Sequence, residues 1–262
     1  MASPIPLAPP VTRAILPSSE KGLLIPCNHI NVSSGSKLVQ LGREITECRR
    51  CPRLIEHCQE VARVKRRAYR DQEYWGKPVP SFGDPRARLL ILGLAPGAHG
   101  ANRTGRVFTG DSSGDLLYRV LFQTGFANRA ESKWRGDGLE LKGAYISCSA
   151  HCAPPDNKPS PEELRNCRPW LERELELLRD LRVVVVLGKI AFDSYLAVLK
   201  ERVNIGRLAD YPFGHNYLHD FEVPVITSYH PSQQNTSTGR LTERMLVDVF
   251  AAARVISDRH IL

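Results

Sequence analysis

Four short apolar runs alternate with helical patterns along this chain, and the alternation restricts the fold more than any other feature. The runs are rich in Val, Ile or Leu and occupy residues 88–94, 143–149, 182–188 and 223–228. Apolar residues recur at helical spacing over 113–124, 161–180, 189–200 and 239–257. Short apolar strands that alternate with helices are typical of a parallel sheet covered on both faces. The sequence therefore predicts an α/β fold.

The N-terminal segment differs in composition from the rest of the chain. Residues 1–38 are rich in Pro and lack a hydrophobic period, so we expect a flexible tail there. A helix is expected to begin near Val39 and, after a turn at CRRCPRL, to continue toward residue 70. The length suits one large domain or two small ones, and we assign residues 39–262 to the folded part of the chain.

Charge and apolar content favour some classes of protein and exclude others. The net charge of +8 is typical of proteins that bind nucleic acid, although soluble enzymes can also be basic. No apolar run approaches the roughly 18 residues that a membrane span needs. The N-terminus lacks a basic segment followed by an apolar one, so a signal peptide is not expected. We expect a cytoplasmic monomer that does not contact membranes.

The seven cysteines favour metal or cluster ligation, because an odd number in a reducing compartment argues against a disulfide framework. Cys58 and Cys148 are weaker candidates, since one lies far along a predicted helix and the other within a predicted strand. The selected ligands form a C-x2-C and a later C-x14-C pair, and they are Cys48, Cys51, Cys152 and Cys167. The spacing does not decide between zinc and an iron–sulfur cluster, and buried apolar thiols remain the alternative.

Three polar loops each follow a predicted strand. They are GLAPGAHGANRTGRVFTGD (residues 93–111, the glycine loop), AHCAPPDNKPS (150–160) and SYHPSQQNT (228–236). Parallel strands end at one edge of a sheet, where open α/β sheets bind ligands, so the loops should form one site. Arg106 and Val107 stand where a P-loop requires Lys and Ser or Thr, and G-x-G-x-x-G is absent, so no nucleotide cofactor is expected. Ser160 and Glu163 predict a capping box at the next helix.

Four side chains in these loops suit the recognition of a base. The ring of Phe108 can stack on a nucleobase, or it can anchor the glycine loop to the sheet. Asp111 can cap the following helix, but two serines after it could do so equally well, which would leave its carboxylate facing the cleft. His230, stiffened by the proline after it, can donate to a developing anion. Asn157 can form a turn or read a base edge.

Taken together, these motifs resemble those of a known enzyme family. The segments that carry the resemblance are CRRCPRL, VPSFGDP, GLAPGAHGANRTGRVFTGD, CAPPDNKPSPEELRNC and SYHPSQQNTSTGRLT. They are similar to the iron–sulfur uracil-DNA glycosylases of family 5, type b, from about Val39 to the C-terminus. The resemblance implies a three-layer α/β/α sandwich around a parallel four-stranded sheet. It also implies a structural [4Fe–4S] cluster on the four selected cysteines.

The activity implied by the resemblance is excision of damaged bases from double- and single-stranded DNA. Such an enzyme flips the nucleotide into a pocket, and water replaces the base at C1′ to leave an abasic site. The resemblance gives His230 the stabilisation of the departing base anion and Phe108 a stacking contact with the base. It gives Asn157, also expected to be catalytic, a contact with the base edge or with the attacking water. Gly93 and Ala95 complete the predicted base contacts. The predicted DNA contacts are His99, Asn102, Arg103, Ser232, Gln234 and Asn235.

Ala95 departs from many members of the superfamily, which place Asp or Asn there to orient the attacking water; family 5 shares the apolar choice. Asp111 is therefore the predicted group that handles water or stabilises the sugar cation. A pocket without a polar side chain at position 95 would also admit hypoxanthine, xanthine and ethenocytosine, an inference that rests on the family.

A second interpretation is a non-catalytic DNA-binding module stabilised by a metal or cluster. It would bind through the basic run ARVKRRAYR at residues 62–70, although such a run is also typical of a solvated helix face. A zinc deaminase is excluded, because no H-x-E precedes a P-C-x-x-C in the sequence.

Overall fold

A mixed sheet with the strand order β1-β3-β2-β4-β6-β5 forms the centre of the computed structural model, which describes residues 34–203 and 205–258. The inner strands are parallel, and they are β3 (Ala144–Cys148), β2 (Leu89–Gly93), β4 (Val183–Leu187) and β6 (Val225–Ser228). Every residue of these strands is buried, which explains their continuous apolar sequence. The predicted α/β class is confirmed.

Two short outer strands correct the prediction of a parallel, four-stranded sheet. β1 (Phe82–Gly83) pairs antiparallel with β3, and β5 (Tyr217–His219) pairs antiparallel with β6, so the sheet has six strands. Both strands are too short to give a recognisable apolar or alternating pattern. Gly83 is required in β1 because a Cβ atom there would lie 2.4 Å from the carbonyl oxygen of Ala144.

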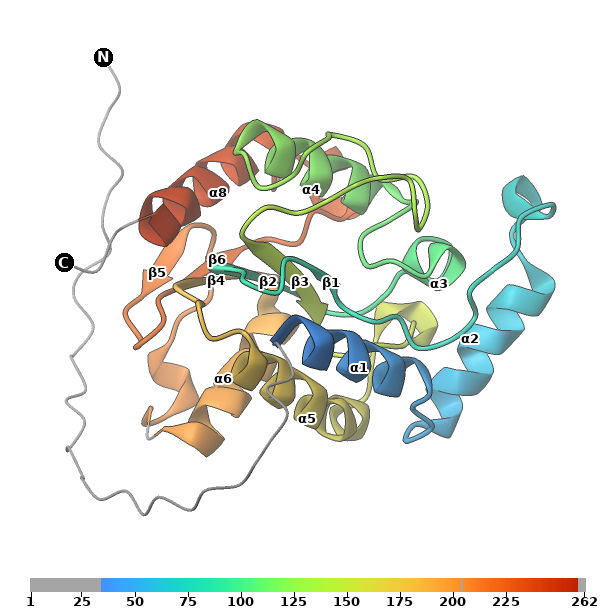
Figure 1. Cartoon of the computed structure of the whole chain (residues 1–262), viewed down its shortest axis with the longest axis horizontal. Coiled ribbons are helices and arrows are strands. Elements are labelled where there is room, and N and C mark those ends of the chain that lie inside the picture. Colours follow the sequence, from blue (N-terminus) through green and yellow to red (C-terminus); the bar gives the residue numbers. More distant parts are fainter. Residues whose placement is uncertain (1–33, 204, 259–262) are drawn as a thin grey trace.

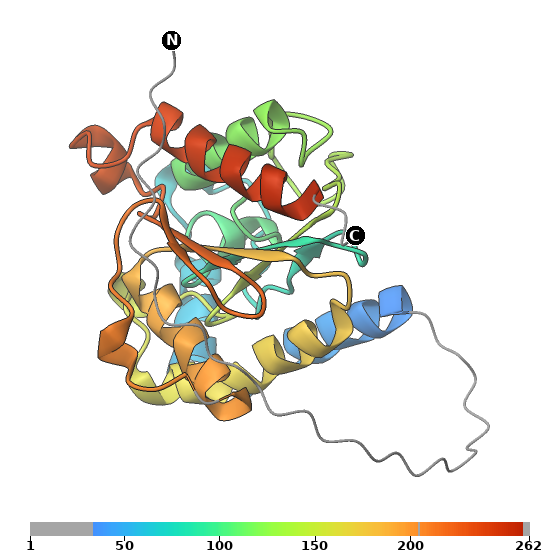
Figure 2. The same cartoon turned by 90° about the vertical axis from the view of Figure 1, so that its left-hand side faces the viewer.

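Helices cover both faces of the sheet (Figure 1). One face carries α4 (Ser112–Gln123) and α8 (Glu243–Asp258), and the other carries α1 (Ser34–Thr46), α5 (Pro161–Leu177) and α6 (Lys189–Arg202). Leu89 and Ile91 of β2 pack with α4 and α8, whereas Leu90 and Leu92 pack with the other three helices. Figure 2 shows the sheet between these two layers.

The N-terminal helices differ from the expectation in where they begin and end. α1 begins at Ser34, before the predicted start near Val39, and Leu38 is buried against the sheet. α2 (Pro52–Val64) begins with a proline, which suits the first turn of a helix, and extends away from the sheet (Figure 1). The predicted tail up to residue 33, including Cys27, lies outside the described residues.

Short elements occupy the loops that leave the strand ends. They are α3 (Ala101–Thr104), η2 (Pro155–Asn157) and α7 (Gln233–Ser237), with η1 (Arg67–Tyr69) after α2 and η3 (Leu208–Asp210) after α6. Pairing continues beyond β2 and β3, because the amides of Ser149 and Ala150 donate to the carbonyl oxygens of Gly93 and Leu94 at 2.9 Å. Among the described helices, none combines the length and apolarity needed to cross a membrane.

Candidate active site

Phe108 of the glycine loop and His230 of the loop after β6 meet at one edge of the sheet. Their ring centroids lie 5.6 Å apart, with the ring planes inclined by 27°. This is the separation of two aromatic rings in direct contact, so a base does not fit between them in this conformation. Phe108 is only 9% exposed, so its ring anchors the glycine loop, the second of the two roles expected from the sequence.

Two glycines set the position of the Phe108 ring. A Cβ atom on Gly93, the last residue of β2, would lie 2.8 Å from the Cε2 and Cζ atoms of the ring. A Cβ atom on Gly114 would lie 1.8 Å from the carbonyl oxygen of Phe108. Phe108 has a φ of +50°, which is unusual for a bulky residue and needs support from its surroundings. Ala95 follows β2 closely and is half-buried.

A buried ion pair fixes the segment that leads into Phe108. The Arg106 guanidinium donates to both carboxylate oxygens of Asp137, at 2.8 and 2.7 Å, and also to the hydroxyls of Thr109 and Ser132. Burial alone would raise the pKa of Asp137, but hydrogen bonds from Arg106 and from backbone amides outweigh it and hold the pKa well below its usual range. Asp137 therefore stays ionised, and the pair holds the loop rigidly.

Asp111 caps α4, which corrects the prediction that the following serines would leave it free. Its Oδ1 atom accepts a hydrogen bond from the Gly114 amide at 3.0 Å. The other oxygen, Oδ2, faces the glycine loop: Cβ atoms on Gly97 and Gly100 would lie 2.9 and 1.9 Å from it. Among the described residues, no donor bonds to Oδ2. One carboxylate therefore caps the helix and keeps a second acceptor oxygen at the loop.

The His230 side chain is neutral at physiological pH, because burial lowers its pKa to about 4. Two side chains predicted to contact DNA instead hold its loop. The Asn235 side chain donates to the carbonyl oxygen of His230 at 2.8 Å, and the Ser232 hydroxyl caps α7 by accepting from the Asn235 amide at 3.4 Å. Neutral imidazole has one N–H donor and one acceptor nitrogen, so His230 can donate one hydrogen bond to a ligand.

Asn102, a predicted DNA contact, is buried in this structure. Its side chain is 0% exposed, and its amide donates to the carbonyl oxygens of Cys58 and Ala98 at 3.2 and 3.4 Å. The bond to Cys58 joins α3 to the middle of α2, and the bond to Ala98 lies within the glycine loop. Asn102 therefore attaches the glycine loop to α2.

Arg103 and His99, also predicted to contact DNA, link the glycine loop to the segment after α2. The Arg103 guanidinium donates to the carbonyl oxygens of His99 and Gly110, both at 2.7 Å. The His99 Nδ1 atom lies 3.0 Å from the hydroxyl of Tyr74. The guanidinium and the ring nitrogen are thus engaged within the protein.

Asn157 and Gln234 are the predicted site residues with exposed side chains. Asn157 has a φ of +56° in a turn, a conformation that asparagine tolerates well. The structure brings Phe108 and His230 together, and the placement of Asn157 beside them stays a prediction.

The four selected cysteines line one small cavity of about 20 Å³ between α2, α5 and the loop after β3. No disulfide joins the described cysteines, Cys48, Cys51, Cys58, Cys148, Cys152 and Cys167. No group of three or more His, Cys, Asp or Glu side chains in the described part of the chain is arranged to hold a metal ion. Cys148 packs toward α4 and α8, on the face of the sheet opposite Cys48 and Cys167, which supports its exclusion as a ligand.

The groups around these thiols suit sulfur atoms that act as ligands to a metal group. The His151 amide donates to the Sγ atom of Cys167 at 3.3 Å, and the Asn166 side chain donates to that of Cys51 at 3.7 Å. Burial raises the pKa of Cys167 to about 12, so this thiol keeps its proton unless a metal displaces it. Four thiols around one cavity, two of them with N–H donors, match a group bound through sulfur in their chemistry, although the described side chains are not arranged around a metal ion.

Comparison with known proteins identifies the family. A model of the Uracil DNA glycosylase superfamily matches residues 80–254. The type-5 uracil-DNA glycosylase of Thermus thermophilus is 48% identical over 215 residues, which cover 80% of this chain and 94% of the relative. The chain belongs to the type-5 uracil-DNA glycosylases.

Other type-5 uracil-DNA glycosylases show the same extent of similarity. The Mycobacterium bovis relative is 46% identical over 223 residues, covering 84% of this chain and 82% of the relative. The Pyrobaculum aerophilum relative is 43% identical over 209 residues, covering 80% and 88%. The predicted resemblance is thereby confirmed.

Some residues that support the site of this type-5 uracil-DNA glycosylase could not be recognised from the sequence. Asp137 and Ser132 lie in the loop before β3, and both bond to Arg106, two residues before Phe108. The only signal was an aspartate between two glycines in WRGDGLE, which marks a turn but not its buried partner. Asn235 could be recognised as part of a polar loop, but nothing in the sequence indicated that its side chain contacts the carbonyl oxygen of His230.

Proposed function

We propose that the chain is a monofunctional DNA glycosylase, which flips uracil out of DNA and hydrolyses the N-glycosidic bond to leave an abasic site. Its relatives are uracil-DNA glycosylases, which supports uracil as the excised base. The observation that carries the proposal is the contact between the Phe108 ring and the neutral His230 imidazole at the strand ends. A flat surface beside a neutral donor suits a base that departs as an anion.

The base would lie against the accessible edge of Phe108, beside His230, because the two rings already touch. As negative charge grows on the departing uracil, the His230 N–H would donate to a ring oxygen. A group with a pKa near 4 carries no ionisable imidazolium proton at neutral pH. His230 would therefore act as a hydrogen-bond donor and would not transfer a proton.

Asp111 would handle the attacking water or stabilise the cationic sugar. An ionised carboxylate only accepts hydrogen bonds, so Oδ2 can orient a water toward C1′. The cap formed by Oδ1 fixes the orientation of the group. Asn157 would reach the base edge or the water from the loop after β3 once DNA is bound.

Ala95 supports a broader range of bases than uracil alone. It lies half-buried just after β2 and presents a methyl group where a polar side chain could select one base edge. A pocket without that selection would accept hypoxanthine, xanthine and ethenocytosine.

The cysteine cavity would hold a structural [4Fe–4S] cluster on Cys48, Cys51, Cys152 and Cys167. The four thiols and the two N–H donors to sulfur support this assignment. The bound group would crosslink the start of α2 to the loop after β3 and to α5, and it would take no part in releasing the base.

An end-labelled oligonucleotide with one uracil tests the proposal, as a duplex and as a single strand. The purified protein should yield a cut only after alkali treatment. A cut before alkali would refute the monofunctional reaction. Binding without base release from a panel of uracil, hypoxanthine, xanthine and ethenocytosine would instead identify a non-catalytic DNA-binding module.

A further inference from the structure

The basic run singled out in the sequence does not form one helix face. α2 ends at Val64, and the cations that follow lie in a turn closed by the Lys65 side chain, which donates to the Arg70 carbonyl oxygen at 3.2 Å. We call residues 65–70 the basic turn. Its remaining cations are exposed, and they are Arg66, Arg67 and Arg70. Within the described part of the chain none of the three pairs with a carboxylate, whereas the neighbouring Arg63 pairs with Glu60.

The basic turn is attached to the glycine loop through Arg103. The Arg103 guanidinium lies 4.0 Å from the centroid of the Tyr69 ring, and it donates to Gln72 at 2.5 Å. The same guanidinium donates to the carbonyl oxygen of Gly110, the residue before Asp111. A single side chain thus connects the turn to the cap of α4.

Backbone contacts make this attachment rigid. The Trp75 amide donates to the carbonyl oxygen of Arg103 at 2.9 Å, and the Gly76 amide donates to that of Asn102 at 3.0 Å. The Trp75 ring leaves no room beside Gly105, where a Cβ atom would lie 2.8 Å from it. The chain from the basic turn to Gly76 is therefore packed along α3.

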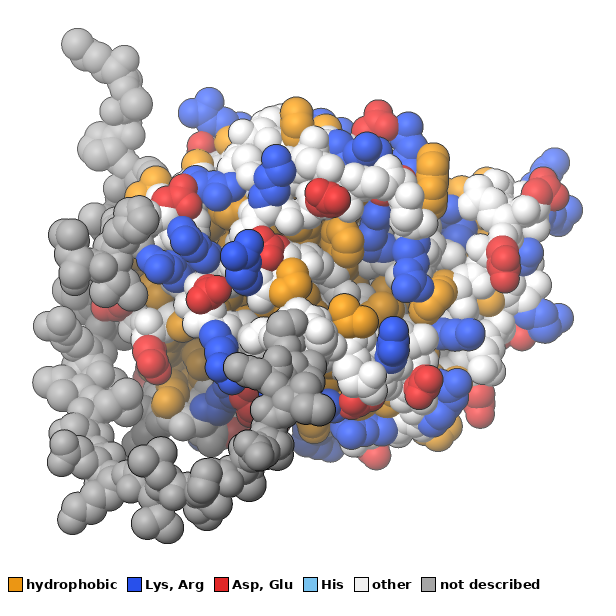
Figure 3. Space-filling model, viewed as in Figure 1, with side chains coloured by type: hydrophobic (Ala, Val, Ile, Leu, Met, Phe, Trp, Pro, Cys, Tyr) orange, Lys and Arg blue, Asp and Glu red, His pale blue; other side chains and the backbone are white. Residues whose placement is uncertain are grey.

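The positive charge of the basic turn also affects His99, a residue of the glycine loop. Burial lowers the pKa of His99, and the positive charges of Arg66 and Arg103 lower it further. Figure 3 shows Lys and Arg side chains, interspersed with Asp and Glu side chains, at the right-hand end of the molecule, where α2 and the basic turn lie. Three exposed guanidinium groups without carboxylate partners, on a turn attached to the glycine loop, suit a polyanion.

We propose that Arg66, Arg67 and Arg70 bind the phosphate backbone of DNA beside the flipped nucleotide. Their attachment through Arg103 would set the distance between the bound phosphates and the base pocket. The inference rests on the proposed function, because it takes DNA as the ligand of the neighbouring site. Guanidinium groups match phosphate oxygens in geometry as well as charge.

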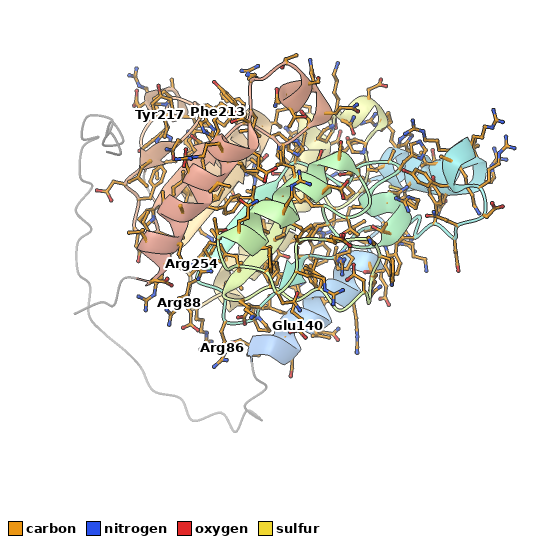
Figure 4. All side chains as sticks on the ribbon, turned by 90° about the horizontal axis from the view of Figure 1, so that it is seen from above. Arg86, Arg88, Glu140, Phe213, Tyr217 and Arg254 are labelled. Carbon is orange, nitrogen blue, oxygen red and sulfur yellow. The ribbon has the colours of Figure 1, made fainter. Side chains whose placement is uncertain are left out.

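The test compares two double variants with the same change in charge. The double variant Arg66→Gln with Arg67→Gln should bind an undamaged DNA duplex about tenfold more weakly near physiological salt. The negative slope of log K against log salt, where K is the association constant for DNA, should become shallower by about two. Arg86→Gln with Arg88→Gln is the matched control, because these residues precede β2 at the end away from the glycine loop. Figure 4 shows them on the other side of the molecule from α2. The control should keep the affinity and slope of the unsubstituted protein.

An unchanged salt slope in the Arg66 and Arg67 variant, or an equal loss in the control, would overturn the proposal. Circular dichroism should show that both variants are folded, since the substitutions lie at the surface. The binding measurement uses undamaged DNA and does not depend on base release. Failure of the unsubstituted protein to release uracil would therefore refute the proposed function, while the comparison of slopes would still decide the role of the basic turn.

Discussion

Individual residues in the site are held at distances that leave no space for a methyl group. Gly93→Ala should displace the Phe108 ring, because its Cβ atom would lie 2.8 Å from two ring atoms. Single-turnover uracil release should fall at least tenfold, which is roughly 1.4 kcal/mol in the activation free energy. Gly42→Ala is the control: its Cβ atom would meet that of Pro80 at an ordinary 3.5 Å. Equal rates in the two variants would contradict the role of the ring.

Two substitutions of Asp111 distinguish its role as the cap of α4 from its proposed role in base release. Asn caps helices as well as Asp, so Asp111→Asn should change the free energy of unfolding by less than about 0.5 kcal/mol. Asp111→Ala should lose about 1 kcal/mol. Both should slow single-turnover base release at least tenfold, since each removes the charge. Full activity of Asp111→Asn would restrict the carboxylate to its structural role.

The depressed pKa of His230 predicts an unusual pH dependence. The pKa near 4 keeps the imidazole neutral from pH 8 to 6, so the rate should show no inflection from His230 in that range. His230→Ala should lower the rate at least tenfold throughout. The unfolded chain protonates this residue near pH 6.5, so its contribution to stability declines as the pH falls from about 6.5 toward 4. An inflection near pH 6.5 that disappears in His230→Ala would show that the ring titrates normally.

Among the structural elements, the loop between α4 and β3 supports the glycine loop through the buried pair of Arg106 and Asp137. Arg106→Met alone should cost about 3–5 kcal/mol in the free energy of unfolding, because it leaves an unpaired buried carboxylate. Arg106→Met combined with Asp137→Leu should cost less than the sum of the two single changes. Urea unfolding measures both, and the exposed pair of Arg244 and Asp248 provides a control worth less than about 1 kcal/mol.

The pH dependence of the stabilisation by Arg106 and Asp137 follows from the direction in which the pKa of Asp137 is shifted. The pKa of Asp137 is depressed in the folded protein, so its stabilisation is present above about pH 4, the value for an unfolded aspartate, and is lost as the pH falls further. The control pair should show a much smaller change over the same range. For the substitutions described above, a free-energy cost of the double variant equal to the sum of the two single costs would mean that Arg106 and Asp137 do not interact.

Local elements could be predicted from the sequence because their causes are local. The inner strands appeared as unbroken apolar runs, and Ser160 and Glu163 form the expected capping box at the start of α5. β1 and β5 were missed, because two or three residues on an edge carry no pattern. The direction in which a polar side chain points depends on distant partners, and for this reason Asn102 was assigned to DNA although Cys58 holds it.

Across the whole molecule, the cysteine cavity joins segments that are far apart in the sequence. If it holds a cluster, Cys152→Ala should abolish absorbance at about 400 nm and lower the midpoint of thermal unfolding. Cys148→Ala should keep the absorbance, because Cys148 packs on the other face of the sheet. Iron analysis and visible spectra of the purified proteins provide the measurement. Loss of the absorbance in both variants, or its absence from the unsubstituted protein, would refute the assignment.

The convergence of three loops at one sheet edge followed from the order of strands, and the structure places Phe108 and His230 in contact there. The sequence could not specify how far each loop reaches. The Asn157 side chain, for example, is exposed at the surface, although its loop follows β3 as expected. Backbone order can be inferred from periodicity, whereas the distance between two side chains depends on packing throughout the fold.

The cysteine cavity also has a consequence for biogenesis. Cys48 and Cys51 leave the ribosome roughly a hundred residues before Cys152 and Cys167. At translation rates of about 5–20 residues per second, the first two thiols remain without their partners for about 5–20 s. During that interval α1 has no sheet on which to dock, and the apolar side chains that it later buries are open to chaperones. Any metal group must therefore be delivered to a chain that is already more than half synthesised.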